Sequence, residues 1–125
     1  MILDTNALSA FADEQMSVLQ ALTPTRELAL PVIVIGEYRF GIALSRRRDW
    51  YQDWLNEFLK DCRILDIDEF TTHHYADIRV HLKLSGTPIP VNDVWIAALC
   101  RQHDLPILSR DRHFDSVPLI QRLPW

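Results

Sequence analysis

The sequence predicts an α/β fold with a mostly parallel sheet of about five strands, covered by helices on both faces. Two observations lead to this prediction. Short apolar runs alternate along the chain with longer segments whose apolar residues recur at helical spacing, and strands connected through helices lie parallel in a buried sheet. The composition, with 48% apolar and 24% charged residues, is typical of a globular protein with a core. With 125 residues and no repeat or linker, we expect one domain, residues 1–125.

The first half of the chain is expected to hold two strands and three helices. The strands cover residues 2–3 and 28–30, and the helices cover residues 7–11, 14–22 and 32–44. Asn6 is the expected cap of the first helix. Pro24 ends the second, because a proline disfavours helix in the residue before it. Pro31 suits the first turn of the third helix, where its missing N–H costs nothing.

The second half continues the alternation. Helices are expected over residues 50–59, 68–84 and 91–103, strands over residues 63–65, 106–109 and 119–120, and a helical turn over residues 111–114. Gly86 suits the end of the helix over residues 68–84. Trp50, Trp54 and Phe58 recur at helical spacing, which favours core packing over a partner groove.

Charge and composition exclude several classes of protein. The 17 acidic and 13 basic residues give a net charge of −4, which argues against a strong non-specific nucleic-acid binder. Cys62 and Cys100 form no C-x-x-C pair, so buried thiols are expected. The longest apolar run, residues 28–35, falls far short of the roughly 20 residues that cross a bilayer. Met1 precedes no basic or cleavable apolar segment, and a cytoplasmic protein is therefore expected.

Two acids lie within apolar helical stripes. Glu37 shares a face with Ile33, Phe40 and Leu44, so it is expected to point inward, where an unpaired carboxylate is costly. A salt bridge to arginine, or a stripe that turns to solvent, is the structural alternative. Asp93 heads a similar stripe with Ile96, Ala97 and Cys100, although an acid in a first helical turn can also be a cap.

Two further acids follow predicted strands. Asp4 ends the first strand, and Asp111 comes just after the strand over residues 106–109. In open parallel sheets the ligand crevice lies outside the carboxyl ends of the strands, so both acids can face one ligand. A turn or cap carboxylate is the structural alternative for each.

Taken together, four carboxylates in one crevice need a cation to offset their repulsion. Oxygen ligands without paired cysteines or metal-spaced histidines favour Mg²⁺, or Mn²⁺, over zinc. Such an ion neutralises a phosphodiester oxygen and lowers the pKa of a bound water, as hydrolysis of a nucleic-acid backbone requires. We expect Asp4 and Asp93 to hold the metal, with Glu37 and Asp111 completing the cluster directly or through waters.

At this point the chain resembles a known family. It resembles PIN-domain proteins, most closely VapC toxins. Their signatures are matched, in the right order along nearly the whole sequence, by Asp4-Thr5-Asn6, Glu37 with Gly41, residues 93–98 and residues 109–114. The resemblance implies a three-layer α/β/α sandwich and a magnesium-dependent endoribonuclease of a toxin–antitoxin pair. It implies that the four acids form the metal site, that a cognate antitoxin covers the site, and that the toxin forms homodimers. Ser109 stands where the family more often has threonine.

Other residues have competing interpretations. Arg110 and Arg112 are expected to hold RNA phosphates near the metal, whereas residues 46–48, three arginines, suit a solvated helix start. His113 is either an active-site neighbour or a surface histidine, and Asp115 suits an ordinary surface acid. His73, His74 and His81 offer a metal-free ribonuclease as an alternative, but His73 and His74 point about 100° apart on a helix.

Two further classes of function remain as alternatives to the nuclease. One is a non-catalytic binding module of similar fold, against which the intact acids argue. The other is a phosphotransferase with an aspartyl nucleophile, which usually has a second Asp two residues later, where this chain has Asn6.

Overall fold

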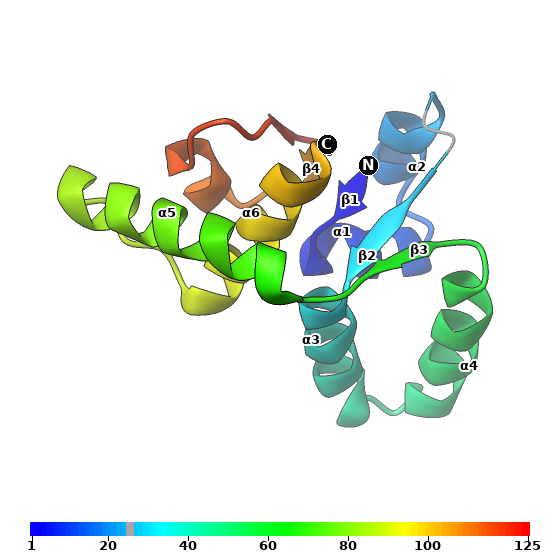
Figure 1. Cartoon of the computed structure of the whole chain (residues 1–125). Coiled ribbons are helices and arrows are strands. Elements are labelled where there is room, and N and C mark those ends of the chain that lie inside the picture. The colour runs from blue at the N-terminus through cyan, green and yellow to red at the C-terminus, as the bar shows by residue number, and fades with distance from the viewer. Residues whose placement is uncertain (25–26) are drawn as a thin grey trace.

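The computed structural model describes residues 1–24 and 27–125. Five parallel strands form the central sheet of this described part, in the order β3-β2-β1-β4-β5 (Figure 1). The strands are β1 (Ile2–Leu3), β2 (Ala29–Pro31), β3 (Arg63–Leu65), β4 (Ile107–Leu108) and β5 (Arg122–Leu123). Every pairing is parallel, as the alternation of strands and helices predicted.

Helices flank the sheet, which confirms the three-layer α/β/α architecture. They are α1 (Thr5–Ala12), α2 (Met16–Leu22), α3 (Val32–Ala43), α4 (Arg48–Leu59), α5 (Glu69–Ser85) and α6 (Val91–His103), and a 3₁₀ helix, η1, covers Arg112–Ser116. Helix α3 packs against α1 and α4, and α5 packs along α6. Figure 1 shows α3 and α4 diverging from their connecting loop on one side of the sheet, and α5 and α6 in contact on the other side.

Strand β1 occupies the centre of the sheet. Ile2 pairs with Ala29 of β2 on one side and with Ile107 of β4 on the other, and Leu3 pairs with Leu108. All of these side chains are buried, as expected for a parallel sheet covered on both faces. Because β1 lies next to β4, the residues that follow these two strands meet at the same edge.

The N-terminal boundaries of the first two helices differ from the prediction. Helix α1 begins at Thr5, and its cap is Asp4, whose carboxylate accepts a hydrogen bond from the Thr5 N–H; the expected cap, Asn6, lies inside the helix. Helix α2 begins at Met16, because Glu14 adopts a left-handed conformation, with φ of 55°, that ends the preceding turn.

Two other boundaries also shift. Pro31 is the last residue of β2 and precedes α3, so it does not lie in the first helical turn. The fifth strand covers Arg122–Leu123 rather than residues 119–120. Leu119 has a φ of 66°, which is incompatible with a strand, and its side chain is exposed.

The predicted inward face of α3 is wrong. Phe40 and Leu44 are exposed by 77% and 90%, whereas Tyr38 and Ile42 are buried. Apolar residues occur on most sides of this helix, so its sequence offers two apolar faces, and packing against α1 and α4 selects the one that contains Tyr38. Glu37 therefore lies at the border between the buried and the exposed side.

The aromatic stripe of α4 packs largely into the core, as predicted. Trp54 and Phe58 stack on each other and both contact Phe11 of α1. Trp50, one turn earlier, is 48% exposed. Both cysteines are free, Cys100 buried and Cys62 partly buried. None of the helices in the described ranges combines the length and apolar character needed to span a bilayer.

Candidate active site

Asp4 is a buried carboxylate held by three donors. Its Oδ1 accepts a hydrogen bond of 2.8 Å from the Thr5 N–H, and its Oδ2 accepts bonds of 2.6 Å from Ser109 Oγ and 3.2 Å from Asn6 Nδ2. Only 5% of the residue is exposed. These bonds fix the direction of a carboxylate that directly follows the central strand.

Asp111 follows β4 and is joined to Asp4 through Ser109. The Asp111 N–H donates to Ser109 Oγ at 2.9 Å, and the same hydroxyl donates to Asp4. Asp111 Oδ1 accepts from the His113 N–H at 2.9 Å, which caps η1. The register between β1 and β4 thus brings two strand-end acids together, as predicted, although each is also a cap.

Asp93 lies in the first turn of α6 but does not cap it. The cap position is Pro90, with no side-chain cap bond, so the capping interpretation of Asp93 is wrong. Its Oδ2 lies 3.1 Å from His113 Nδ1. The carboxylate therefore faces the acids at the sheet edge.

Glu37 reaches the same cluster from α3. Its carboxylate is close enough to Asp4 and Asp93 for their charges to raise its pKa, although burial contributes most to the shift. One of its oxygens, Oε1, is buried without a hydrogen-bond partner. No lysine or arginine of residues 1–24 and 27–125 forms an ion pair with Glu37, so the salt-bridge alternative finds no support.

Neighbouring acids disfavour the charged forms of Asp4, Glu37 and Asp93. Burial is the main cause of a raised pKa at Asp4 and Asp93, and repulsion from Asp111 adds to it at both. Hydrogen bonds from Ser109 and Thr5 offset part of the shift at Asp4. A cation placed among these carboxylates would relieve both the desolvation and the repulsion.

His113 joins the cluster as its nearest basic group. Its Nδ1 lies 2.9 Å from Asp111 Oδ1 and 3.1 Å from Asp93 Oδ2. The contact with Asp93 is the main reason that the pKa of His113 is raised. Ligand atoms of Asp93, Asp111 and His113 all lie within 4.8 Å of one another, a spacing compatible with a metal ion. Of the two interpretations of His113, the structure supports the active-site neighbour.

In the described part of the chain, neither predicted phosphate-binding arginine forms an ion pair with an acid of the cluster. Arg110 is exposed, with its guanidinium 4.6 Å from the centroid of the Trp125 ring. Arg112 is also exposed. Asp115 forms a two-pronged ion pair with Arg122, with bonds of 2.7 and 2.9 Å, which supports its interpretation as an ordinary surface acid.

The alternative histidines do not assemble a site. His73, His74 and His81 lie along α5, and His81 contacts Ser85 of the same helix. Within the described ranges, the group of three or more metal-type side chains that comes together is the one containing Asp93, Asp111 and His113. The histidine-based ribonuclease therefore has no geometric support.

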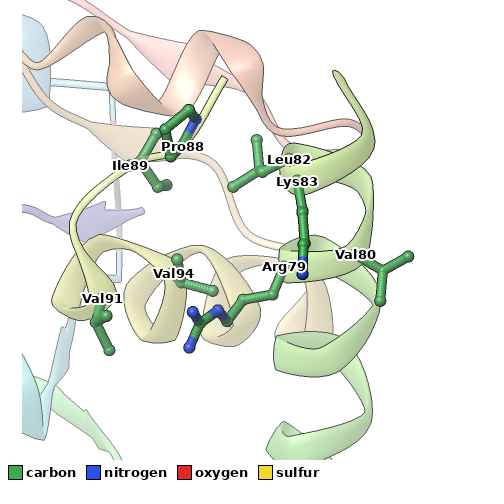
Figure 2. Close-up of a pocket in the computed structure, with 8 residues that line it drawn as sticks. All are labelled: Arg79, Val80, Leu82, Lys83, Pro88, Ile89, Val91 and Val94. Atoms are coloured by element: carbon green, nitrogen blue, oxygen red, sulfur yellow. The ribbon is translucent and has the colours of Figure 1, made fainter. Parts of the chain in front are cut away.

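A hollow lined by α5 and α6 does not contain the acids. It has a volume of about 550 Å³ and lies between α5, the start of α6 and the loop before α6. Figure 2 shows Leu82, Ile89 and Val94 around it, with Arg79 and Lys83 at its edge. A smaller hollow of about 260 Å³, bounded by α1, α3 and α4, includes Thr5 and Glu37 and so adjoins the acidic cluster.

Sequence reasoning missed the polar residues that orient the acids. Asn6 was expected as a cap, yet its side chain donates to Asp4, and its Oδ1 accepts from the Arg110 N–H at 3.4 Å. Ser109 was noted as a hydroxyl but not as the bridge between two acids. The signal was its place at the end of a strand that neighbours β1 in the sheet.

Comparison with known proteins places these features in context. The PIN domain family model matches residues 1–119. Ribonuclease VapC5 of Mycobacterium tuberculosis is 30% identical over 115 residues, which cover 90% of this chain and 84% of that protein. VapC ribonuclease Y4jK of Sinorhizobium fredii is 32% identical, with coverage of 100% and 97%. The crystal structure of FitAcB from Neisseria gonorrhoeae superposes with a TM-score of 0.88 at 29% identity, covering 98% of this chain and 95% of that chain.

Proposed function

Because the chain belongs to the PIN domain family, and within it to the VapC group, we propose that it is a divalent-metal-dependent endoribonuclease, the toxin of a toxin–antitoxin pair. The observation that carries this proposal is the convergence of Asp4, Glu37, Asp93 and Asp111 from four elements onto one edge of the sheet. Residues 1–125 are proposed to form one nuclease domain that acts in the cytoplasm.

The donor set fits a hard divalent cation. Carboxylate oxygens predominate, and Asp4 is oriented by Ser109 and Asn6 as a metal ligand is oriented by its outer neighbours. Asp4 and Asp93 are proposed to hold Mg²⁺, or Mn²⁺, with Asp111 and Glu37 completing the site directly or through waters. When bound, the ion neutralises charge on the scissile phosphodiester and provides an activated water.

The chain's own groups then have distinct tasks. Asp4 and Asp93 supply the negative charge that attracts a cation. Ser109 fixes the position of Asp111 relative to Asp4, because its hydroxyl donates to Asp4 and accepts from the Asp111 N–H. Arg110 and Arg112, both exposed, are proposed to hold RNA phosphates by charge-assisted hydrogen bonds. Hydrolysis by water does not need the 2′-hydroxyl as nucleophile, so the products should carry 5′-phosphate and 3′-hydroxyl ends.

An RNA cleavage assay tests the proposal directly. Single-stranded RNA should be cut with Mg²⁺ or Mn²⁺ and left intact in EDTA. Asp93→Asn should remove activity, whereas Asp77→Asn, a control at an exposed acid on α5, should not. Full activity in EDTA, or cyclic phosphate products, would contradict the metal mechanism. If the wild type cuts no RNA with either metal ion but still binds its partner, the chain is a binding module instead.

The proposed partner is an antitoxin that inserts a cation into the acidic cluster. A lysine or arginine side chain competes for the oxygens that would otherwise bind metal, and it relieves the same repulsion. Co-expression with the neighbouring gene should yield a stable complex with little ribonuclease activity, and excess Mg²⁺ should restore that activity only in part. A complex that cleaves RNA at the rate of the free enzyme would show that inhibition does not act by occupying the site.

A further inference from the structure

The hollow between α1, α3 and α4, called the chamber below, opens beside the acidic cluster and has both polar and apolar groups in its lining. It is lined by Thr5, Ser9 and Asp13 from α1 and its end, by Glu37 and Tyr38 from α3, and by Tyr51 from α4. Thr5 follows Asp4 in the chain, and Glu37 belongs to the acidic cluster itself. A ligand in the chamber would therefore lie next to a phosphate bound at the proposed metal site.

Tyr38 leaves an unpaired hydroxyl at this chamber. The residue is only 3% exposed, and its hydroxyl has no hydrogen-bond partner. A buried polar group without a partner is costly, so each one in a native protein calls for an explanation.

The side chains that line the chamber favour a nucleobase over a phosphate or an apolar side chain. Glu37 and Asp13 would repel a phosphate, and an apolar side chain would leave the Tyr38 hydroxyl unpaired. A nucleobase fits both restrictions, because its amino groups donate to carboxylates while its ring nitrogens and carbonyls accept from hydroxyls. The volume, about 260 Å³, lies just below the ~300 Å³ at which pockets for drug-sized ligands begin, which suits one base rather than a whole nucleotide.

A second hollow continues the path away from the cluster. It shares Asp13 with the chamber, and its lining includes Arg47 and Trp50. The Arg47 guanidinium lies 4.5 Å from the centroid of the Trp50 ring, and Trp50 is 48% exposed. An exposed aromatic ring beside a cation is the combination that binds the base and the phosphate of single-stranded nucleic acid.

From these contacts we propose that the chamber receives one base of the RNA strand next to the scissile phosphate, and that Arg47 and Trp50 hold the following nucleotide. The proposal rests on the proposed ribonuclease activity and names how that same site engages its substrate. Tyr38 selects the base through its hydroxyl, and the strand runs from the acids along α1 to the start of α4.

Gly41 provides a test that fills the chamber without disturbing the fold. It lines the chamber, and a Cβ added there meets no atom within 4 Å. Gly36 is a matched control, because it lies on the same helix, also has free space at its Cβ and does not line the chamber. The probe is a fluorescent single-stranded RNA of mixed sequence, together with copies that each lack one base, with binding measured in Ca²⁺.

Gly41→Leu should weaken RNA binding by about tenfold, whereas Gly36→Leu should stay within twofold of the wild type. Tyr38→Phe should weaken binding by about threefold and remove the penalty for the missing base at one position, while its thermal stability stays equal or rises. Trp50→Ala should also weaken binding by about tenfold. Phe70→Ala, at an aromatic residue that is 70% exposed on α5, should not.

Cleavage of the same RNA in Mn²⁺ separates this inference from the proposed function. If the wild type cleaves RNA but Gly41→Leu binds and cuts every probe normally, the base chamber is wrong and the ribonuclease stands. If the wild type does not cleave at all, the proposed function fails. If Gly41→Leu spares RNA binding but abolishes the complex with the neighbouring gene's product, the chamber is a protein groove, and the inference is overturned.

Discussion

Asp4 ends the central strand and also caps helix α1. The N–H groups at a helix start favour a negative charge, and here Thr5, Ser109 and Asn6 all donate to the carboxylate. Burial and the neighbouring acids act in the opposite direction and prevail, because the pKa of Asp4 is raised. Asp4 is therefore a charged group that the folded chain tolerates at a cost.

Replacing Asp4 by Asn should raise stability while removing activity. In metal-free buffer at pH 7 the free energy of unfolding should increase by about 1 kcal/mol, because the variant no longer holds a buried charge. The gain should shrink as the pH falls through the raised pKa of Asp4 and vanish below the ordinary aspartate pKa of about 3.9, where Asp4 is neutral in both states. RNA cleavage should fall by at least ~100-fold. Urea unfolding and a cleavage assay measure both effects, and an unchanged or lower stability at pH 7 would contradict this electrostatic account.

His113 should stabilise the metal-free protein in a pH-dependent way. Its pKa is raised in the folded state, chiefly by Asp93, so its contribution is complete below the ordinary histidine pKa of about 6.5. It should disappear as the pH rises through the higher folded-state value. In EDTA, His113→Gln should be less stable than the wild type at pH 6 and equally stable at pH 9. The same deficit at both pH values would mean that His113 acts through packing and not through its charge.

At this scale the sequence predicted the acids better than their surroundings. Asp4, Asp93 and Asp111 converge as expected, because strand ends and the start of α6 follow from the sequence pattern. Glu37 also reaches the cluster, although the α3 face predicted around it is wrong. The partners of Asp4 were not predictable, since Asn6 reaches back to Asp4 only once the helix starts at Thr5.

Helix α3 shows why an element can be predicted while its orientation is not. Its bounds, Val32–Ala43, agree closely with the apolar run, but the face built around Phe40 and Leu44 turned out to be exposed. Periodicity identifies a buried face only when the opposite face is polar. Which of the two apolar faces is buried depends on where α1 and α4 pack. The sequence of α3 alone does not specify those positions.

The junction of α5 with α6 depends on a buried threonine. Thr71 Oγ1 accepts from the Asp68 N–H at 3.0 Å and donates to Gln102 Oε1 of α6 at 2.6 Å. Thr71→Ala should lower the free energy of unfolding by about 1–2 kcal/mol, since it removes a capping box and leaves Gln102 without that donor. Thr72→Ala, at an exposed position, should cost less than ~0.5 kcal/mol. Equal losses in thermal or urea unfolding would show that the link between the helices is unimportant.

For the whole molecule, the strand order decides where the chemistry lies. After β1, the chain adds β2 and then β3 on one side of β1, and it later adds β4 and β5 on the other side. Ligand sites of open parallel sheets form where the order reverses in this way, and Asp4 and Asp111 lie at that point. Parallel pairing was predictable from the alternation of elements. The exact place of β5 was not, because Leu119 adopts a left-handed conformation that the sequence pattern does not reveal.

The proposed homodimer should use the exposed apolar side of α3. Phe40 and Leu44, one turn apart, are 77% and 90% exposed, and burying such a pair is favourable. The double variant Phe40→Glu, Leu44→Glu should be monomeric by light scattering, with thermal stability of the monomer unchanged because both side chains face solvent. Phe70→Glu on α5 is the control and should remain dimeric. If only the Phe70 variant dissociates, the contact is on α5.

The hydrogen bond from Ser109 to Asp4 joins residues that are 105 positions apart. The pairing of β1 with β4 can therefore form only after nearly the whole chain has been synthesised. On the ribosome, a nascent chain that carries Asp4, Glu37 and Asp93 still lacks the strand that brings Asp111 beside them. The four-acid site is therefore complete only when residues 107–113 have emerged and folded.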